Sequence, residues 1–380
     1  MNFSAFDHQC MASALRLARK GLETTHPNPR VGCVISRDGQ VVGTGWHIRA
    51  GEAHAEVFAL REAGERAAGG TAYVTLEPCS HVGRTPPCVD ALIKAGVARV
   101  IFAIGDPNPD VNGNGVQRLQ QAGIDVQGGL MAAAAEALNA GFLKRMREGL
   151  PWVRIKLAQS IDGHVALANF RSQWISGPES RADVQRWRAR SDGILTGIGT
   201  VLADDPLLNV RDSQTHDNQA DDSQADDSQT GRQPARIVID SHWRTPPAAR
   251  LLKLPGKVLI AGLETRQVPA ALGQTGAECL RMPVFEGRVD MQAVLHELAR
   301  RGFNEIQVEA GATLCGTLLQ QGLVDELLIY QAPVILGGSA LSPFALPRLD
   351  NMDDRVHLEW VDSRRIGNDL RLRLKPVFRG

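Results

Sequence analysis

The sequence of 380 residues has no net charge, because 42 lysines and arginines balance 42 aspartates and glutamates. A general attraction to nucleic acid or to an anionic membrane is therefore not expected. The sequence also lacks an apolar run of the roughly 20 residues that a membrane-spanning helix needs, and its start lacks the basic-then-apolar order of a signal peptide. We therefore expect a cytoplasmic protein that binds neither nucleic acid nor membrane.

Cysteine is scarce, with six residues in the whole chain. This number is too small for a disulfide framework in a chain of this length, so any close pair is better explained as metal ligands or as a nucleophile. Only Cys79 and Cys88 form such a pair. The other four cysteines have no ligand-type neighbours at suitable spacing, and we expect them to pack as small apolar side chains.

The common nucleotide-binding fingerprints are also missing. No G-x-G-x-x-G and no G-x-x-x-x-G-K-[ST] occurs, and the nearest match, which begins at Gly197, fails at its third glycine. Residues 306–317 do lead from a strand through glycine into a helix, where backbone N–H groups can approach a phosphate. From this segment alone, a plain strand-to-helix turn is the simpler interpretation.

The length suggests two or three domains, and the hydrophobic pattern divides the chain near residue 150. Short apolar strands alternate with helices through residues 1–147, including a hairpin with an Asp-Gly turn and a final helix over 132–147. This alternation predicts an α/β domain whose sheet is covered by helices. The pattern breaks at residues 148–151, which we interpret as a linker, and a second α/β domain is expected over 152–380.

One segment of the second domain has nothing to bury. Residues 212–231 form four polar pentads, DSQTH-DNQAD-DSQAD-DSQTG, with no apolar side chain larger than alanine. Such a repeat cannot offset the entropy cost of ordering itself, so we predict a disordered insertion over 212–233. The alternative is an acidic tract that binds a metal or a partner, although six aspartates spread among glutamines make a weak cation site.

Four residues of the first domain have the pattern of a catalytic zinc site. His54 and Glu56 open a predicted helix, Cys79 follows a strand, and Cys88 opens the next helix. Zinc prefers neutral imidazole and thiolate, and a helix N-terminus favours the thiolate form. Three protein ligands leave the fourth position to water, whose pKa zinc lowers to near 7, and Glu56 is suited to carry its proton to a leaving nitrogen.

The spacing narrows the class of enzyme. Zinc deaminases share an H-x-E motif followed by P-C-x-x-C, and this chain matches the first half but has eight residues between its two cysteines instead of two. The longer gap still permits tetrahedral ligation but disfavours the ordinary nucleoside and polynucleotide deaminases. His81, inside that gap, could compete as a ligand, although its place in the loop better suits substrate or solvent.

Three segments of the first domain carry a family resemblance: THPNPRVGCV (25–34), GEAHAE (51–56) and TLEPCSHVGRTPPC (75–88). They resemble the deaminase half of the bifunctional deaminase/reductases of riboflavin biosynthesis, in which the eight-residue gap is usual. The resemblance implies a cytidine-deaminase-like α/β/α domain that removes the 2-amino group of 2,5-diamino-6-(5-phosphoribosylamino)pyrimidin-4-one. It also implies zinc held by His54, Cys79 and Cys88, proton transfer by Glu56, and contact between Asn28 and the pyrimidine.

The second domain resembles the reductase half of the same family through KLAQSIDG (156–163), SQWIS (172–176) and GTVLADDP (199–206). The resemblance implies a dihydrofolate-reductase-like α/β domain that uses NADPH to reduce the ribosyl group to ribityl. By this resemblance, an NADP pocket would be lined by Ala158, Trp174, Thr200, Asp204, Ser241, Gly311, Ala312, Thr313, Leu314, Cys315, Gly316 and Thr317. The phosphoribosyl substrate would face Ser172, Arg188, Leu208, Arg211 and Glu309.

Arginine suits a sugar phosphate, because the guanidinium group binds phosphate by paired hydrogen bonds. Together with the family resemblance, this leads us to expect two reactions on one small-molecule pyrimidine substrate. We also expect a homo-oligomer. Two rivals remain open. A nucleic-acid deaminase is disfavoured because residues 1–150 carry 15 basic and 14 acidic side chains. The second rival is a deaminase whose second domain only binds or dimerises. Such a protein would not oxidise NADPH when the deaminated pyrimidine is supplied.

Overall fold

The computed structural model describes residues 3–80, 87–107, 113–211 and 232–378. It divides into two compact units, Met1–Leu150 and Pro151–Gly380, and the division falls within the linker that the sequence predicts at 148–151. Among the described helices, none combines the length and the apolar character that crossing a membrane requires.

The first unit alternates helices with short strands. Its sheet has the strand order β2-β1-β3-β4-β5, in which β1 is antiparallel to β2 and β3, while β3, β4 and β5 run parallel. The elements are α1 (Ala5–Ala18), β1 (Gly32–Arg37), β2 (Gln40–Trp46), α2 (Ala55–Ala63), β3 (Thr71–Leu76), α3 (Cys88–Lys94), β4 (Arg99–Ile104), α4 (Asn114–Gln121), β5 (Asp125–Gly128), α5 (Ala132–Leu138) and α6 (Ala140–Glu148).

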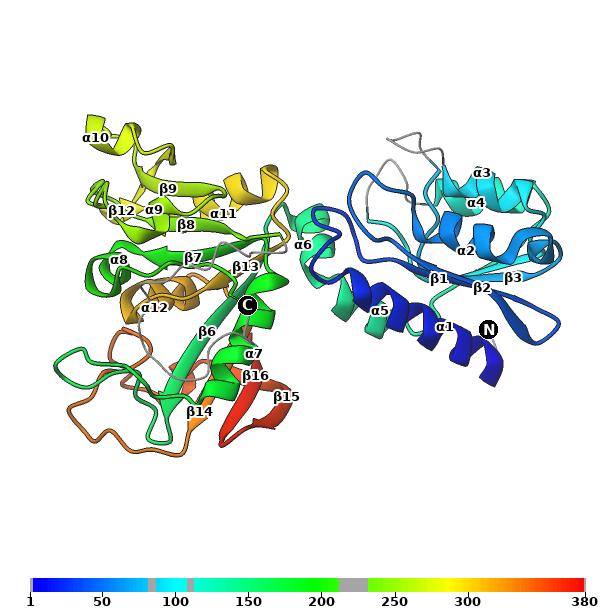
Figure 1. Cartoon of the computed structure of the whole chain (residues 1–380). Coiled ribbons are helices and arrows are strands. Elements are labelled where there is room, and N and C mark those ends of the chain that lie inside the picture. Colours follow the sequence, from blue (N-terminus) through cyan, green and yellow to red (C-terminus); the bar gives the residue numbers. More distant parts are fainter. Residues whose placement is uncertain (1–2, 81–86, 108–112, 212–231, 379–380) are drawn as a thin grey trace. The chain divides into compact units, whose positions relative to one another are not determined.

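Helices cover both faces of this sheet, as Figure 1 shows. Residues of α2, α3 and α4 pack with one face of the strands, and residues of α1, α5 and α6 pack with the other. The β1–β2 hairpin turns at Asp38 and Gly39, whose φ angles of 50° and 75° are those that an Asp-Gly turn favours. The expected helix-covered α/β sheet is therefore present.

The helix expected over residues 132–147 is wrong in one respect, because it is two helices that meet at Asn139. The Asn139 side chain is buried, its Oδ1 accepts from the Arg30 N–H at 2.8 Å, and its Nδ2 donates to the Arg30 carbonyl at 3.0 Å. This pairing fastens the junction of α5 and α6 to the loop that carries Asn28. A contact between residues so far apart in sequence has no local signature.

The second unit contains a nine-stranded sheet of order β10-β9-β8-β7-β13-β6-β14-β16-β15. Its strands run parallel except for β16, which is antiparallel to both β14 and β15. A separate two-stranded ribbon joins β11 to β12. The elements are β6 (Trp152–Ser160), α7 (Pro178–Ala189), β7 (Gly193–Gly197), α8 (Ile198–Asp204), β8 (Ala235–Ile239), α9 (Arg250–Lys253), β9 (Val258–Leu263), α10 (Ala270–Gly273), β10 (Glu278–Met282), β11 (Val284–Phe285), β12 (Arg288–Val289), α11 (Met291–Arg300), β13 (Glu305–Val308), α12 (Ala312–Gln320), β14 (Glu326–Ala332), β15 (His357–Ile366) and β16 (Asp369–Val377).

The parallel strands of this unit share one carboxyl edge, which is where open α/β sheets bind ligands. Segments that follow β6, β7, β8 and β13 meet at this edge, and they supply the candidate reductase residues. The C-terminal hairpin of β15 and β16 extends the sheet on the side of β14 (Figure 1).

The insertion predicted for residues 212–233 extends too far at its C-terminal end. Residues 212–231 lie outside the described residues, but Arg232 and Gln233 are held in place. Arg232 Nη2 donates to Asp192 at 2.6 Å, and the Gln233 amide pairs with both backbone groups of Val210 at 2.8 and 3.1 Å. The sequence pattern around residues 232 and 233 could not predict these contacts, because their partners Asp192 and Val210 lie before the pentad repeat.

Candidate active sites

The first candidate site joins three side chains from three short motifs. His54 precedes α2, Cys79 follows β3, and Cys88 is the first residue of α3. Their ligand atoms lie within 4.8 Å of one another, with His54 Nδ1 at 3.1 Å from Cys88 Sγ and 3.4 Å from Cys79 Sγ. One imidazole and two thiols at these distances are a donor set that fits zinc. His81, the competing ligand, lies outside the described residues.

The electrostatics of this cluster favour a thiolate at Cys79. The thiol of Cys88, the imidazole of His54 and the N–H of Cys88 stabilise the Cys79 thiolate and lower its pKa to about 4. The same contact with Cys79, together with burial, raises the pKa of Cys88. Because the two thiols share one proton here, a bound cation would allow both to ionise.

Glu56 lies beside this cluster, in the first turn of α2. It is buried, and its Oε2 has no hydrogen-bond partner among the described residues. Burial raises the pKa of the Glu56 carboxyl, and the negative charge of Cys79 acts in the same direction. A buried carboxyl with a raised pKa is suited to accept and release a proton.

The sequence interpretation included Asn28 but missed its partner, His47. Asn28 Nδ2 lies 3.1 Å from His47 Nε2, and His47 Nδ1 lies 3.2 Å from the carbonyl of Ala53. Burial lowers the pKa of His47, so the ring is neutral, donates from Nδ1 and accepts from Asn28 at Nε2. The amide of Asn28 is thereby oriented. His47 also contacts the His54 ring edge-on, with centroids 5.4 Å apart.

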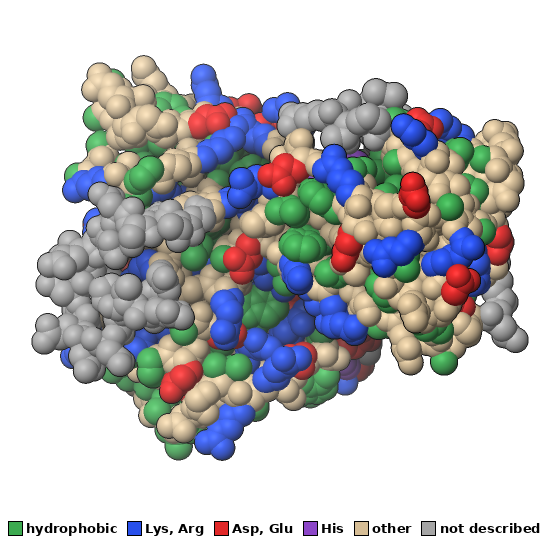
Figure 2. Space-filling model, turned by 45° about the vertical axis from the view of Figure 1, so that its right-hand side comes forward, with side chains coloured by type: hydrophobic (Ala, Val, Ile, Leu, Met, Phe, Trp, Pro, Cys, Tyr) green, Lys and Arg blue, Asp and Glu red, His purple; other side chains and the backbone are tan. Residues whose placement is uncertain are grey.

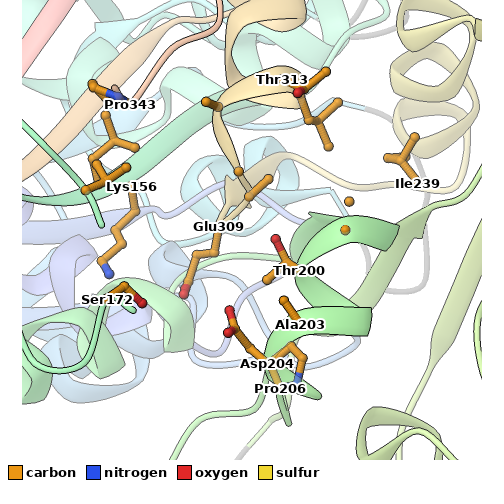
Figure 3. A pocket seen from close by; sticks show the side chains of 18 of the residues that line it. Lys156, Ser172, Thr200, Ala203, Asp204, Pro206, Ile239, Glu309, Thr313 and Pro343 are labelled. Carbon is orange, nitrogen blue, oxygen red and sulfur yellow. The ribbon is translucent and has the colours of Figure 1, made fainter. Parts of the chain in front are cut away.

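The second candidate site is an open cavity of about 1840 Å³ at the carboxyl edge of the nine-stranded sheet. Figure 3 shows Lys156, Ser172 and Glu309 pointing toward one region of it, with Thr200 and Asp204 on α8 nearby. The predicted residues that line this cavity are Ala158, Ser172, Trp174, Arg188, Thr200, Asp204, Leu208, Arg211, Ser241, Glu309, Gly311, Ala312, Thr313, Leu314 and Thr317.

Two predicted residues of α12 do not line the cavity. Cys315 is fully buried, and its thiol donates to the carbonyl of Ala310 at 3.3 Å. Gly316 faces the segment that contains Ala345, because a Cβ there would lie 2.5 Å from the Ala345 carbonyl oxygen. The family resemblance implied that every residue from 311 to 317 lines the pocket. An α-helix has 3.6 residues per turn, however, so only part of its side chains can face one surface.

The start of α12 is open where a phosphate would approach. Gly311 precedes the helix, and no atom of the described residues lies within 4 Å of the position that its Cβ would occupy. Backbone N–H groups at such an N-terminus favour an anion. The strand-to-helix turn that the sequence predicts here therefore lines a cavity.

Arg188 and Glu309 form a bidentate ion pair in the cavity wall. Nε and Nη2 of Arg188 donate to the two carboxylate oxygens of Glu309 at 2.7 and 2.8 Å, and Nη1 donates to the Asn209 carbonyl at 2.9 Å. Although burial acts to raise it, the Arg188 charge lowers the pKa of Glu309 to about 2. The guanidinium is therefore fixed in one orientation.

The segment before the insertion is also tied down. The Arg211 N–H donates to the Gln185 side chain of α7 at 3.1 Å, and Val210 pairs with Gln233. Leu208 is buried with a φ of 50°. These contacts place Arg211 in the cavity wall although the pentad repeat follows it directly.

Lys156 is a cavity residue to which the sequence interpretation gave no role. It lies in the middle of β6, where burial lowers its pKa and the Glu309 carboxylate opposes that shift. The available signal was a charged residue inside the otherwise apolar run Ile155–Ala158. Lys156 is half-buried, and lysines that lie inside a fold are usually paired or functional.

Comparison with known families assigns both units. A family model described as the cytidine and deoxycytidylate deaminase zinc-binding region matches residues 4–104, and one described as the RibD C-terminal domain matches residues 151–372. The second model alone covers more than half of the chain.

Full-length relatives and solved structures agree with these matches. The riboflavin biosynthesis protein RibD of Escherichia coli (strain K12) is 52% identical over 374 residues, which cover 97% of this chain and 99% of the relative. That of Haemophilus influenzae is 44% identical over 377 residues and 99% of both chains.

The solved structure of Acinetobacter baumannii RibD, form 1, matches with a TM-score of 0.89 and 44% identity, over 98% of this chain and 99% of that one. A diaminohydroxyphosphoribosylaminopyrimidine deaminase/5-amino-6-(5-phosphoribosylamino)uracil reductase from Thermotoga maritima matches with a TM-score of 0.84 and 27% identity, over 98% and 99%. With a deaminase-like zinc-binding unit and a reductase unit in one chain, the protein belongs to the RibD family of bifunctional deaminase/reductases of riboflavin biosynthesis.

Proposed function

We propose that each unit of this chain carries one of the two reactions. The first unit, predicted over residues 1–147, would deaminate 2,5-diamino-6-(5-phosphoribosylamino)pyrimidin-4-one to 5-amino-6-(5-phosphoribosylamino)uracil. The second, predicted over 152–380, would then reduce the ribosyl group to ribityl with NADPH. The observation that carries this proposal is the cluster of His54, Cys79 and Cys88 beside Glu56, whose Oε2 has no hydrogen-bond partner among the described residues. One imidazole and two thiols can hold zinc, and a buried carboxyl beside them can transfer the protons that hydrolysis of an aminated heterocycle requires.

Zinc held by His54, Cys79 and Cys88 would supply the Lewis acidity that makes water a nucleophile near neutral pH. Glu56 would take one proton from the attacking water and deliver it to the 2-amino nitrogen, which leaves as ammonia. The second proton of the water would pass from the oxygen to a ring nitrogen, so that C2 becomes a carbonyl carbon. Asn28, oriented by neutral His47, would hydrogen-bond the pyrimidine edge. The raised pKa of the Glu56 carboxyl supports this exchange because it favours the protonated form that delivers the proton.

NADPH would supply hydride in the second unit. The helix start at Gly311 and the walls from Thr200, Asp204 and Ser241 would hold the dinucleotide. Arg188, fixed by Glu309, and Arg211 would bind the sugar phosphate. Lys156 Nζ, which points toward Ser172 in Figure 3, would supply the proton that the sugar ring oxygen takes up when the ring opens, before hydride reaches C1.

Two coarser expectations join this proposal. On the face shown in Figure 2, Lys and Arg side chains are interspersed with Asp and Glu, which supports a small-molecule substrate over nucleic acid. We also propose a homo-oligomer in the cytoplasm. Trp360 and Leu358 on the edge strand β15 support association, since they are 69% and 41% exposed. Sedimentation of wild type against Trp360→Ser tests this point, and a monomeric wild type would contradict it.

The reaction assignment is tested on the purified full-length chain. Zinc is quantified, the diaminopyrimidine is supplied with NADPH, and products are identified by mass spectrometry. We expect one zinc per chain, ammonia release, and a ribityl product only when NADPH is present. Ammonia release without any NADPH oxidation would support the rival in which the second unit only binds or dimerises.

A further inference from the structure

The cavity of the second unit has an exposed aromatic ring beside the predicted sugar site. Phe170 lines the cavity in the loop between β6 and α7, two residues before Ser172. Its side chain is 76% exposed, although phenylalanine is usually buried. Phe170 is not among the residues assigned to either reaction.

The backbone conformation at Phe170 is unusual for an aromatic residue. Phe170 has a φ of 66°, in the left-handed region that glycine adopts easily and an aromatic residue does not. A tight turn fixes this conformation, with the Phe170 N–H donating to the Leu167 carbonyl and the Leu167 N–H donating to the Arg171 carbonyl, both at 2.9 Å. The position therefore suits glycine better than phenylalanine unless the ring itself is used.

The other large aromatic side chains of the cavity are less exposed than Phe170, with 57% for Trp174 and 47% for Phe285. Among the described residues, Phe285 lies in β11 and His242 follows β8, close in sequence to Ser241 of the NADP wall. Phe344 is half-buried. Trp174 already carries the Arg181 guanidinium over its ring, 4.6 Å from the centroid. Phe170 thus presents the most exposed ring on the Ser172 side.

The substrate has a part that the polar residues of the cavity do not explain. Lys156, Arg188 and Glu309 can serve the sugar and its phosphate, but the pyrimidine is attached to C1 of that sugar through a single nitrogen. A flat heterocycle with polar edges and apolar faces therefore lies next to the reacting carbon. Aromatic side chains bind such rings by stacking.

We propose that Phe170 stacks on the pyrimidine ring of the reductase substrate and so distinguishes a pyrimidine-linked sugar phosphate from a free one. This inference rests on the proposed reductase function and adds a specificity-determining residue to it. Phe170 acts on binding and takes no part in hydride or proton transfer.

The test compares three full-length variants with wild type in NADPH oxidation with the deaminated pyrimidine. Phe170→Gly removes the ring and suits the local φ, so it should fold, while Phe170→Tyr keeps a ring. Ile335→Ala is a matched control, since Ile335 is also 76% exposed but does not line the cavity. Ribose 5-phosphate, which lacks the pyrimidine, serves as a competitive inhibitor.

Phe170→Gly should raise KM for the pyrimidine substrate by about tenfold, in the range expected for losing one stacked base. Its KM for NADPH and its inhibition constant for ribose 5-phosphate should equal those of wild type, and Phe170→Tyr and Ile335→Ala should behave as wild type throughout. An unchanged KM, or an equal weakening of ribose 5-phosphate, would overturn this inference alone. Absence of NADPH oxidation by wild type would overturn the proposed function as well.

Discussion

The two candidate sites of this chain are built in different ways. The zinc cluster consists of His54, Cys79 and Cys88, with Glu56 beside it, and each of these side chains lies at a strand end or a helix start. The cavity of the second unit is lined by residues from Lys156 to Ala345, and many of them contribute backbone or apolar surface. A site that depends on a few side chains should fail when one is changed. A site that depends on the whole fold should weaken gradually.

The largest effect is expected from Cys79→Ala. Removing one of three ligands leaves too few donors for zinc, so the metal should be lost and deamination abolished, while reduction of the deaminated pyrimidine should continue. Cys33→Ala is the control, because Cys33 is another cysteine of the first unit, is fully buried and is not in the cluster. Metal analysis together with both activities checks this prediction, and a full equivalent of zinc in Cys79→Ala would remove the site as described.

Glu56→Gln should separate chemistry from metal binding. The amide keeps the size of the side chain but cannot exchange the proton, so ammonia release should fall roughly 10²-fold or more. Zinc content and melting temperature should stay at wild-type levels, since Glu56 is assigned as a proton carrier and not as a ligand. Loss of zinc from Glu56→Gln would show that the carboxylate is part of the metal site.

Arg188→Ala should weaken the second site gradually. It removes a fixed guanidinium and leaves Glu309 without its partner, so kcat/KM for reduction should fall roughly 10- to 100-fold, the range for hydrogen bonds to charged groups. Arg186→Ala on the same helix is the control, since that side chain is 70% exposed. Zinc content and ammonia release should not change in either variant. A reductase rate equal to wild type would contradict the assignment of Arg188.

The same ion pair predicts how stability depends on pH. The pKa of Glu309 is about 2 in the folded chain against an ordinary 4.5, so the folded state holds this proton less tightly than the unfolded state. The resulting stabilisation, on the order of 3 kcal/mol, is present above pH 4.5 and is lost as pH falls toward 2. The difference in unfolding free energy between wild type and Glu309→Gln should therefore narrow over that range. A difference that stays constant from pH 5 to pH 3 would count against the pair.

The smallest effect is expected from the pentad repeat. Replacing residues 213–231 by a short Gly-Ser linker should leave melting temperature and both activities nearly unchanged, since the repeat has no apolar side chain larger than alanine to bury. The contacts of Val210 with Gln233 remain in this variant. Loss of reduction alone would indicate that the repeat positions Arg211 or closes the cavity.

The parts of the structure that follow local rules were predictable from the sequence. The Asp38-Gly39 turn requires only positive φ angles, and a histidine and two cysteines at strand ends and helix starts meet because those ends lie on one side of the sheet. The α/β class of both units and the family itself were also predicted, and both are confirmed.

The parts that depend on distant contacts were not predictable. Asn139 divides α5 from α6 through bonds to Arg30, 109 residues away in sequence. Gly316 turns from the cavity because α12 packs against the segment at Ala345. Lys156 and His47 lie in segments whose pattern signals only a strand or its end, and their neighbours Glu309 and Asn28 come from other parts of the chain.

The central claim, that two independent sites act in sequence on one substrate, is tested most directly by NADPH consumption of Glu56→Gln with each pyrimidine in turn. We predict wild-type consumption with the deaminated pyrimidine and almost none with the diaminopyrimidine, because reduction follows deamination and Glu56 serves only the first step. Equal rates with both compounds would contradict the order of the steps. No consumption with either would contradict the independence of the two sites.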